Sequence, residues 1–543
     1  MRRLIAASAV LWASALTAQV NESIDVRVVN VDVTVMSRKG PVRGLTRDDF
    51  EIREDGKVQT ITNFYTSDET RPTVAVTAAA ASSPAAAPVA PQDERFRRKV
   101  LVLVENHHTT RRARDTSLRA LEAMINDRFH GDYEWSIGVI GRGVTLVLPL
   151  SSDKAAIHEA LEIIRKIGTG EEGTSSFAGA MDRQGSTPAN PDVQKTSWAV
   201  FDKDFSSRLS QAGANDDAER VIAAKFTVPA ILDSVRGFAS TAGRKIVLLL
   251  TGDPGLNDVE IVMQGGGNGF NVRGFDRQGE RLWANQRAIE DLRTRIIQEA
   301  NASDVSFYIW NVQGLTAPGG MGAGGLPVTN TSAAFWLSNQ TGGRLITGND
   351  QVRALQEFDT TSSSFYSLGY TPAHPDDGRY HSISVSMKRK GDYSLAYRAG
   401  YSANPTSTQL ARAMQSPTAA AMQASALPVT LALGEPQTDR GTVVTLPIEV
   451  KVPFRALQFL PSTHGVAANV VVYVSVFAET GRNLVATAIP LAPAFKSGAP
   501  DLDGMLVYRN AIKLRANERQ RIVVAVRDAI TESIGMATEV VKF

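Results

Sequence analysis

Two nearly continuous apolar runs constrain this chain more than any other feature of its sequence. Residues 99–104 read KVLVLV, and residues 245–250 read KIVLLL. Strands without polar alternation are typical of a parallel sheet that is covered on both faces. Helical stripes lie between and beyond these runs, at 118–129, 157–167 and 284–302. Buried strands that alternate with amphipathic helices predict an α/β fold with a doubly wound, mainly parallel sheet.

The segments on either side of this region alternate apolar and polar residues instead. Residues 22–66 contain VNVDVTV, and residues 363–402 contain HSISVSM. Such alternation predicts half-buried strands. Neither segment is large enough to bury a core by itself. We therefore expect 20–70 and 363–402 to pair into one β-sandwich that holds the α/β domain as an insertion.

Composition divides the rest of the chain. A chain of 543 residues is long enough for about three domains. The stretch 71–95 has the composition of an Ala/Pro linker, and 403–424 is an Ala-, Ser- and Gln-rich linker. The α/β domain is therefore expected at 96–362. Short alternating runs within 425–543 have the spacing of a second β-sandwich domain.

Residues 1–18 have the layout of a secretory signal peptide. Two arginines precede an apolar run at 4–16, and a small-residue cleavage point follows. This run is shorter than the roughly 20 residues that span a bilayer. We therefore expect a secreted or periplasmic protein without a membrane span after cleavage. The absence of cysteine excludes disulfides and thiol catalysis, and a net charge of +2 gives no reason to expect a nucleic acid partner.

Three stretches resemble the von Willebrand factor A-type domain and a VWFA-related bacterial family that is common in acidobacteria. They are VNVDVTVMSRKGPVRGLTRDDFEIREDGK (29–57), the strand and polar loop at 99–112, and SFYSLGYTPAHPDDGRYHSISVSMKRKGDYSLAYRAGY (364–401). The A-type resemblance covers 99–359, and the wider family resemblance covers 22–402. It implies a doubly wound domain that binds a protein partner through a hydrated Mg²⁺ and performs no catalysis.

The resemblance also implies a metal-dependent adhesion site, of which this chain keeps only part. The family's first loop reads Asp-x-Ser-x-Ser, and Glu105, His107 and Thr109 stand at those three positions. Glu is longer than Asp by one C–C bond, about 1.5 Å. His removes an oxygen ligand of the kind that Mg²⁺ prefers. Asp253 matches the carboxylate after the fourth strand, one place later than in the family's pattern.

Two interpretations of this strand-end loop stay open. In the first, the two carboxylates and Thr109 form a weakened Mg²⁺ site, to which Thr169 or Thr174 adds a hydroxyl. In the second, the loop is a polar strand end that caps the next helix through Thr109 or Thr110. The sequence does not choose between the two second-loop threonines.

The leading functional hypothesis is an exported interaction protein that is not an enzyme. Its α/β domain would present loops at the carboxyl end of the sheet, including the insertions 168–215 and 263–280, to an unknown protein partner. One alternative is a metal-dependent hydrolase that uses the polar cluster of Glu105, His107, His108 and Asp253 for acid–base chemistry. Another is a purely structural envelope protein whose β-sandwiches carry the function.

Overall fold

The computed structural model describes most of the chain. The described residues are 28–67, 98–106, 109–128, 133–141, 143–169, 216–239, 243–252, 287, 289–312, 332–348, 350–422, 427–438, 442–462, 465–478, 483–491, 493–495, 501–531 and 533–543. The expected signal peptide and the expected linker at 71–95 lie outside this set. Within it, no helix combines the length and the hydropathy that crossing a bilayer requires.

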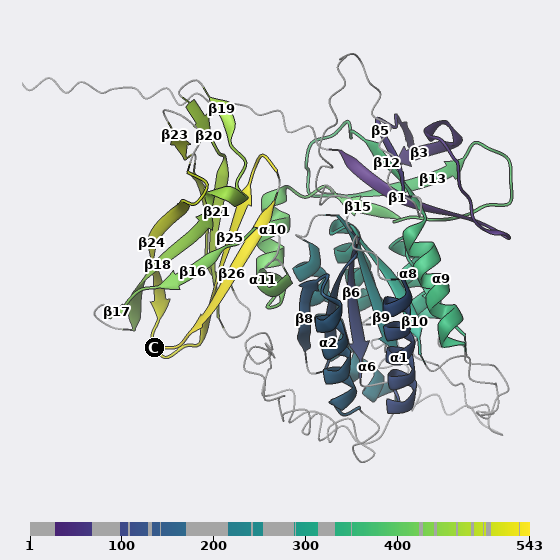
Figure 1. Ribbon diagram of the computed structural model, residues 1–543, viewed down its shortest axis with the longest axis horizontal. Helices are drawn as coiled ribbons and strands as arrows, with labels where there is room; N and C mark the ends of the chain where they lie inside the picture. The colour runs from purple at the N-terminus through teal and green to yellow at the C-terminus, as the bar shows by residue number, and fades with distance from the viewer. Residues whose placement is uncertain are drawn as a thin grey trace, which may run out of the picture.

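A six-stranded sheet forms the centre of the α/β domain, with the order β8-β7-β6-β9-β10-β11 (Figure 1). Five strands run parallel: β6 (Arg98–Glu105), β7 (Tyr133–Ile140), β9 (Arg244–Thr251), β10 (Val305–Asn311) and β11 (Arg344–Ile346). The edge strand β8 (Val144–Ser151) is antiparallel to β7. Numbered along the chain, this is the doubly wound order 3-2-1-4-5-6, whose switch point lies between β6 and β9.

Helices cover both faces of this sheet. One face packs on α1 (Arg111–Arg128), α2 (Lys154–Lys166) and α9 (Gln351–Ser363). The other face packs on α6 (Asp216–Ala239), the helical residues 289–302 and α8 (Ser332–Gln340). Leu101 and Leu103 lie in one core and Val102 and Val104 in the other, because successive side chains of a strand point to opposite faces. The predicted α/β class with parallel strands is confirmed.

Strands from both sides of the α/β domain form a two-layer region, the first β region. One sheet has the order β14-β1-β12-β5, with β2 on β1, and the other has the order β15-β13-β3-β4. The strands are β1 (Val29–Ser37), β2 (Gly40–Pro41), β3 (Phe50–Glu54), β4 (Lys57–Gln59), β5 (Asn63–Ser67), β12 (Phe365–Tyr370), β13 (Tyr380–Met387), β14 (Ser394–Ala396) and β15 (Gly400–Ser402). Val31 pairs with Leu368 and Ile52 with Val385. All four share one core, so the two segments bury each other's apolar faces.

A second β region follows near the end of the chain. One sheet contains β16 (Thr430–Leu433), β17 (Gln437–Thr438), β18 (Val443–Pro453) and β24 (Met505–Arg515). The other contains β21 (Val470–Ala478), β22 (Asn483–Leu491), β25 (Gln520–Asp528) and β26 (Ile534–Val541). Side chains from both sheets, including Val450 and Val474, fill a common core. Antiparallel β regions therefore lie beside the α/β domain, as the sequence predicts.

The segment 403–424 is not the linker that its composition predicts. It forms α10 (Thr406–Gln415) and α11 (Ala419–Met422). Leu410 and Met414 are buried with side chains of β21, β25 and β26, and Met422 is buried in a core of the α/β domain. Arg521 of β25 donates to the Gln415 carbonyl at 2.7 Å at the end of α10. These helices therefore join the α/β domain to the second β region by direct packing.

Candidate functional site at the sheet's carboxyl edge

The two ends of the parallel sheet have different surroundings. At the amino end, Arg244 at the start of β9 lies 3.6 Å from Asp32 of β1 and donates to the Ser362 carbonyl at 3.0 Å. Burial raises the pKa of Asp32, although Arg244 opposes the shift, and burial lowers the pKa of Lys245. These contacts attach the amino end to the first β region (Figure 1). A ligand site is therefore expected at the carboxyl edge of the sheet, as in other doubly wound folds.

Two hydrogen bonds tie the strand ends on either side of the switch point. Glu105 ends β6 and has no exposed surface. Thr251 ends β9 and donates its hydroxyl to Glu105 Oε2 at 3.2 Å. The next backbone N–H, that of Gly252, donates to Thr109 Oγ1 at 3.1 Å. The Glu105 carboxylate at the end of β6 and the Thr109 hydroxyl in the loop that follows therefore both lie beside the end of β9.

A third loop, which follows α2, reaches the same edge. Asn106 Nδ2 donates to the Gly168 carbonyl at 3.5 Å, and Arg114 Nη1 bridges Asn106 Oδ1 at 3.3 Å and the Ile167 carbonyl at 2.7 Å. Thr169 is 5% exposed, and its Oγ1 has no hydrogen-bond partner in the described part of the chain. A buried hydroxyl left unsatisfied costs roughly 1–3 kcal/mol. An oxygen of this kind is a suitable ligand for a hard cation.

The structure places only some of the predicted site residues. It brings Glu105 and Thr109 to one edge, and it adds Thr169 from the loop after α2. Four other candidates lie outside the described residues: His107, His108, Thr174 and Asp253. The expectations that rest on those four therefore stay predictions.

The helix-capping interpretation applies to Thr110 and not to Thr109. Thr110 Oγ1 accepts a hydrogen bond from the Ala113 N–H at 3.1 Å at the start of α1. The Thr109 hydroxyl instead contacts the Gly252 N–H. The two adjacent threonines therefore have different roles: Thr110 caps α1, and Thr109 bonds to the backbone at the carboxyl edge.

Two residues of this edge were not predicted as site residues from the sequence. Thr251 is the last residue of a buried strand, and Asn106 follows the end of another. Both are buried and polar. Their position at the carboxyl ends of strands that flank the switch point is a signal that could have identified them.

No protein-family model and no curated protein matches this sequence. A solved structure of an aerotolerance-related membrane protein from Bacteroides fragilis matches at 11% identity, over 48% of this chain and 97% of that chain, with a TM-score of 0.23. Two Bacteroides uniformis beta-glucuronidase structures match at 10% identity, with TM-scores of 0.16 and 0.15. This chain covers only 13% and 19% of their lengths. We draw no functional conclusion from likenesses this weak.

Proposed function

We propose that this protein is an exported interaction protein, without catalytic activity, whose α/β domain binds a protein partner at the carboxyl edge of its sheet. A weakened Mg²⁺ site of the von Willebrand A type assists that binding. The buried, unpartnered hydroxyl of Thr169 is the observation that carries the proposal. It lies on one of three loops that meet beside the switch point, where a doubly wound sheet binds ligands.

The donors at this edge fit a hard divalent cation in their chemistry. Glu105 would supply a carboxylate, and Thr109 and Thr169 would supply hydroxyl oxygens, which are the ligand types that Mg²⁺ takes. Asp253 is the further carboxylate that the sequence predicts. When bound, the cation supplies a positive charge that an acidic side chain of a partner can coordinate. Weak affinity is expected because Mg²⁺ demands near-ideal octahedral geometry.

The remainder of the proposal follows from the chain's organisation. Export rests on the signal-peptide layout of residues 1–18. The first β region joins the segments on both sides of the α/β domain, which supports a von Willebrand A-like domain inserted in a β-sandwich. In this arrangement the first β region holds the amino end of the parallel sheet, and the long insertions leave from the other end.

A capture experiment with the mature chain tests this proposal. In one variant a short Gly-Ser linker replaces residues 172–212 of the insertion after α2. In the control variant the same Gly-Ser linker replaces the Ala/Pro segment at 74–92. We expect the wild type and the control to retain the same envelope protein, more strongly with Mg²⁺ than with EDTA. The insertion variant should lose it. Equal capture by both variants would contradict partner binding at this edge.

A further inference from the structure

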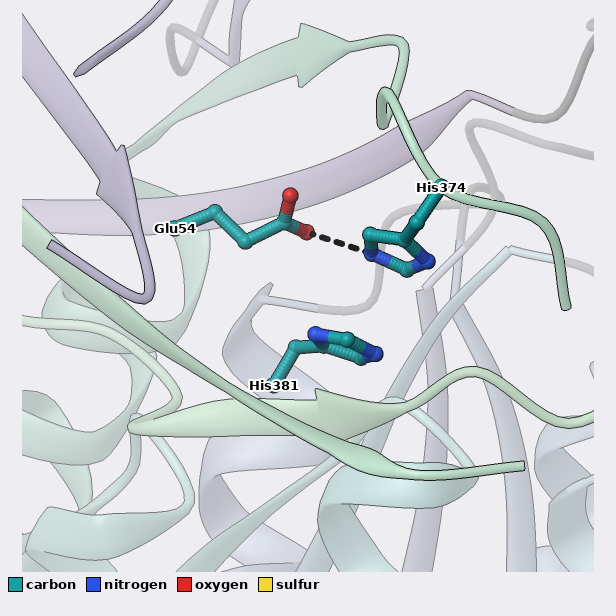
Figure 2. Close-up of side chains that lie close together, drawn as sticks. All are labelled: Glu54, His374 and His381. Carbon is teal, nitrogen blue, oxygen red and sulfur yellow. Dashed lines mark ion pairs between the residues drawn. The ribbon is translucent and has the colours of Figure 1, made fainter. Parts of the chain in front are cut away.

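A second polar cluster lies in the first β region, away from the carboxyl edge. Figure 2 shows Glu54, His374 and His381, and one ligand atom of each lies within 4.8 Å of those of the other two. His381 Nδ1 is 2.8 Å from Asp55 Oδ2, and its Nε2 is 3.2 Å from Asp377 Oδ1. These five residues form the Glu54 cluster, in which two imidazoles and three carboxylates meet.

The fold fixes one side of this cluster and leaves the other side open to solvent. Asp55 and Gly56 have φ values of 47° and 79°, which turn β3 directly into β4 as a two-residue hairpin requires. The Asp55 carboxylate also accepts the Ser382 N–H at 2.9 Å and is thereby held against β13. His374 and Asp377 lie on the loop between β12 and β13. Their side chains are 24% and 27% exposed, which gives an ion a path into the cluster.

Hydrogen bonds around Glu54 and His374 orient both as ligands. Glu54 Oε1 accepts the hydroxyls of Tyr370 at 2.8 Å and Tyr401 at 2.6 Å. His374 Nδ1 lies 2.8 Å from the Pro375 carbonyl, and a carbonyl only accepts, so Nδ1 carries the proton. His374 Nε2 then carries a lone pair that a metal ion can take; the Tyr401 hydroxyl lies 3.2 Å from this atom, and Glu54 Oε1 lies 3.5 Å from it. Metal-binding histidines are held by outer hydrogen bonds of this kind.

His381 has a carboxylate beside each ring nitrogen. An ion on Nε2 would have Asp377 as a neighbouring ligand, and Nδ1 would then donate its proton to Asp55. An ion on Nδ1 would reverse the two roles. In either case a carboxylate orients the ligating ring from behind, as is usual for metal-bound histidine.

The distances agree with a small tetrahedral ion. Zn²⁺ with bonds of about 2.0–2.1 Å holds its ligand atoms about 3.3 Å apart. The distances from His374 Nε2 to Glu54 Oε1 and from His381 Nε2 to Asp377 Oδ1 are 3.5 and 3.2 Å. We propose that the Glu54 cluster binds a divalent transition-metal ion of the zinc class. Its ligands are Glu54, His374, His381 and one of the two aspartates. This site goes beyond the proposed function and does not depend on it.

One conformational change must accompany binding. The rings of His374 and His381 are stacked, with their centroids 3.8 Å apart and an angle of 14° between their planes. A metal ion lies in the plane of each imidazole that binds it, so the two rings must tilt relative to each other. His374 is the ring that moves, because it lies on a loop whereas His381 is held by β13 and Asp55. The bound ion would then link the β12–β13 loop to the β3–β4 turn.

Zinc titration of the full mature chain by calorimetry tests the proposal. We expect saturable binding of a single equivalent of Zn²⁺, with no competition from Mg²⁺, since imidazole ligands suit zinc and not magnesium. His374→Ala removes a ligand and should weaken binding at least tenfold. Asp55→Asn weakens binding about 10- to 100-fold, whether it removes a ligand or an outer carboxylate. Both variants are first checked for wild-type circular dichroism.

Two controls exclude other histidines. His158 of α2 also pairs with a carboxylate, at 2.6 Å from Glu122, and its side chain has a similar exposed fraction, 29%. His158→Ala and the double variant His107→Ala/His108→Ala should both keep the wild-type zinc affinity. The proposal is overturned if the wild type binds no zinc, if His374→Ala binds as tightly as the wild type, or if a control variant loses binding to the same extent.

Discussion

The carboxyl edge of the parallel sheet and the Glu54 cluster are both polar, but their side chains are held in different ways. At the edge, Thr169 Oγ1 has no hydrogen-bond partner among the described residues. In the Glu54 cluster, two tyrosines donate to one carboxylate oxygen, and both nitrogens of His381 face carboxylates. The edge consists of strand ends and loops, whereas the cluster connects segments from both sides of the α/β domain.

This difference distinguishes polar groups that stabilise the fold from polar groups that are available to a ligand. A fully satisfied buried network stabilises one arrangement of the chain. An unsatisfied buried group costs stability, and an ion or ligand that completes its hydrogen bonding is one reason to retain it. The Glu54 cluster should therefore contribute strongly to stability even without an ion. At the carboxyl edge, the Thr169 hydroxyl should contribute little until a cation or a partner binds.

Removal of the Glu54 carboxylate should have the largest effect. Glu54→Ala leaves the buried hydroxyls of Tyr370 and Tyr401 without their charged acceptor, and hydrogen bonds to charged groups contribute about 1.5–3 kcal/mol each. We expect the opening free energy of β12 and β13 to fall by about 3 kcal/mol in amide hydrogen exchange. Glu51→Ala on the same strand is the control, because its pair with Arg53 is at the surface and should cost less than about 1 kcal/mol. Equal losses in the two variants would contradict a special contribution of the Glu54 cluster to stability.

A pair of threonine substitutions at the carboxyl edge should act in opposite directions. Thr169→Val replaces an unpartnered hydroxyl with a methyl group of the same shape, so the cation-free protein should be unchanged or stabilised by up to about 1 kcal/mol. Thr251→Val removes the hydroxyl that donates to buried Glu105 and should cost about 1–2 kcal/mol. Thermal melting in EDTA measures both. Destabilisation by Thr169→Val would show that its hydroxyl is already satisfied.

Asp233 is a carboxyl group that belongs neither to the Glu54 cluster nor to the carboxyl edge. Burial raises its pKa to about 6, although Arg236 and Arg521 oppose the shift. The folded state therefore holds this proton more tightly than the unfolded state. Stability from this group is present below pH 4 and is lost as the pH rises through about 6.

Asp233→Asn should remove that component of the pH dependence. The side chain is 32% exposed, so the effect should be on the order of 1 kcal/mol or less. The difference in melting midpoint between wild type and variant, measured at pH 4.5 and pH 7.5, isolates it. A difference that does not change with pH would show that Asp233 titrates normally.

The local sequence pattern predicted the strands and helices of this fold better than it predicted the contacts between them. The apolar runs at 99–104 and 245–250 form the central strands β6 and β9, as the sequence predicts. The helices in 403–424 escaped because Ala and Met carry a weak apolar signal, and only packing against α6 and the second β region shows why Leu410 is buried.

The candidate sites divide in the same way. The resemblance to the A-type domain made Glu105 and Thr109 candidates, because the ligand pattern there is local in sequence. It left Thr169 and Thr174 open; the structure shows Thr169 to be buried, and Thr174 lies outside the described residues. The Glu54 cluster could not be predicted, because Glu54 and His374 come from opposite sides of the α/β domain. Only the antiparallel register of β3 with β13 brings them together.

The central claim is that the carboxyl edge keeps a weakened cation site, and cation-dependent melting of the mature chain tests it most directly. Mg²⁺ at ten times its dissociation constant should stabilise the wild type by about 1.4 kcal/mol. For a domain of this size, that corresponds to a rise of roughly 3–6 °C in its melting midpoint. Thr169→Val should show little or none of this rise. An identical rise in both proteins, or no rise in the wild type at any Mg²⁺ concentration, would contradict the account.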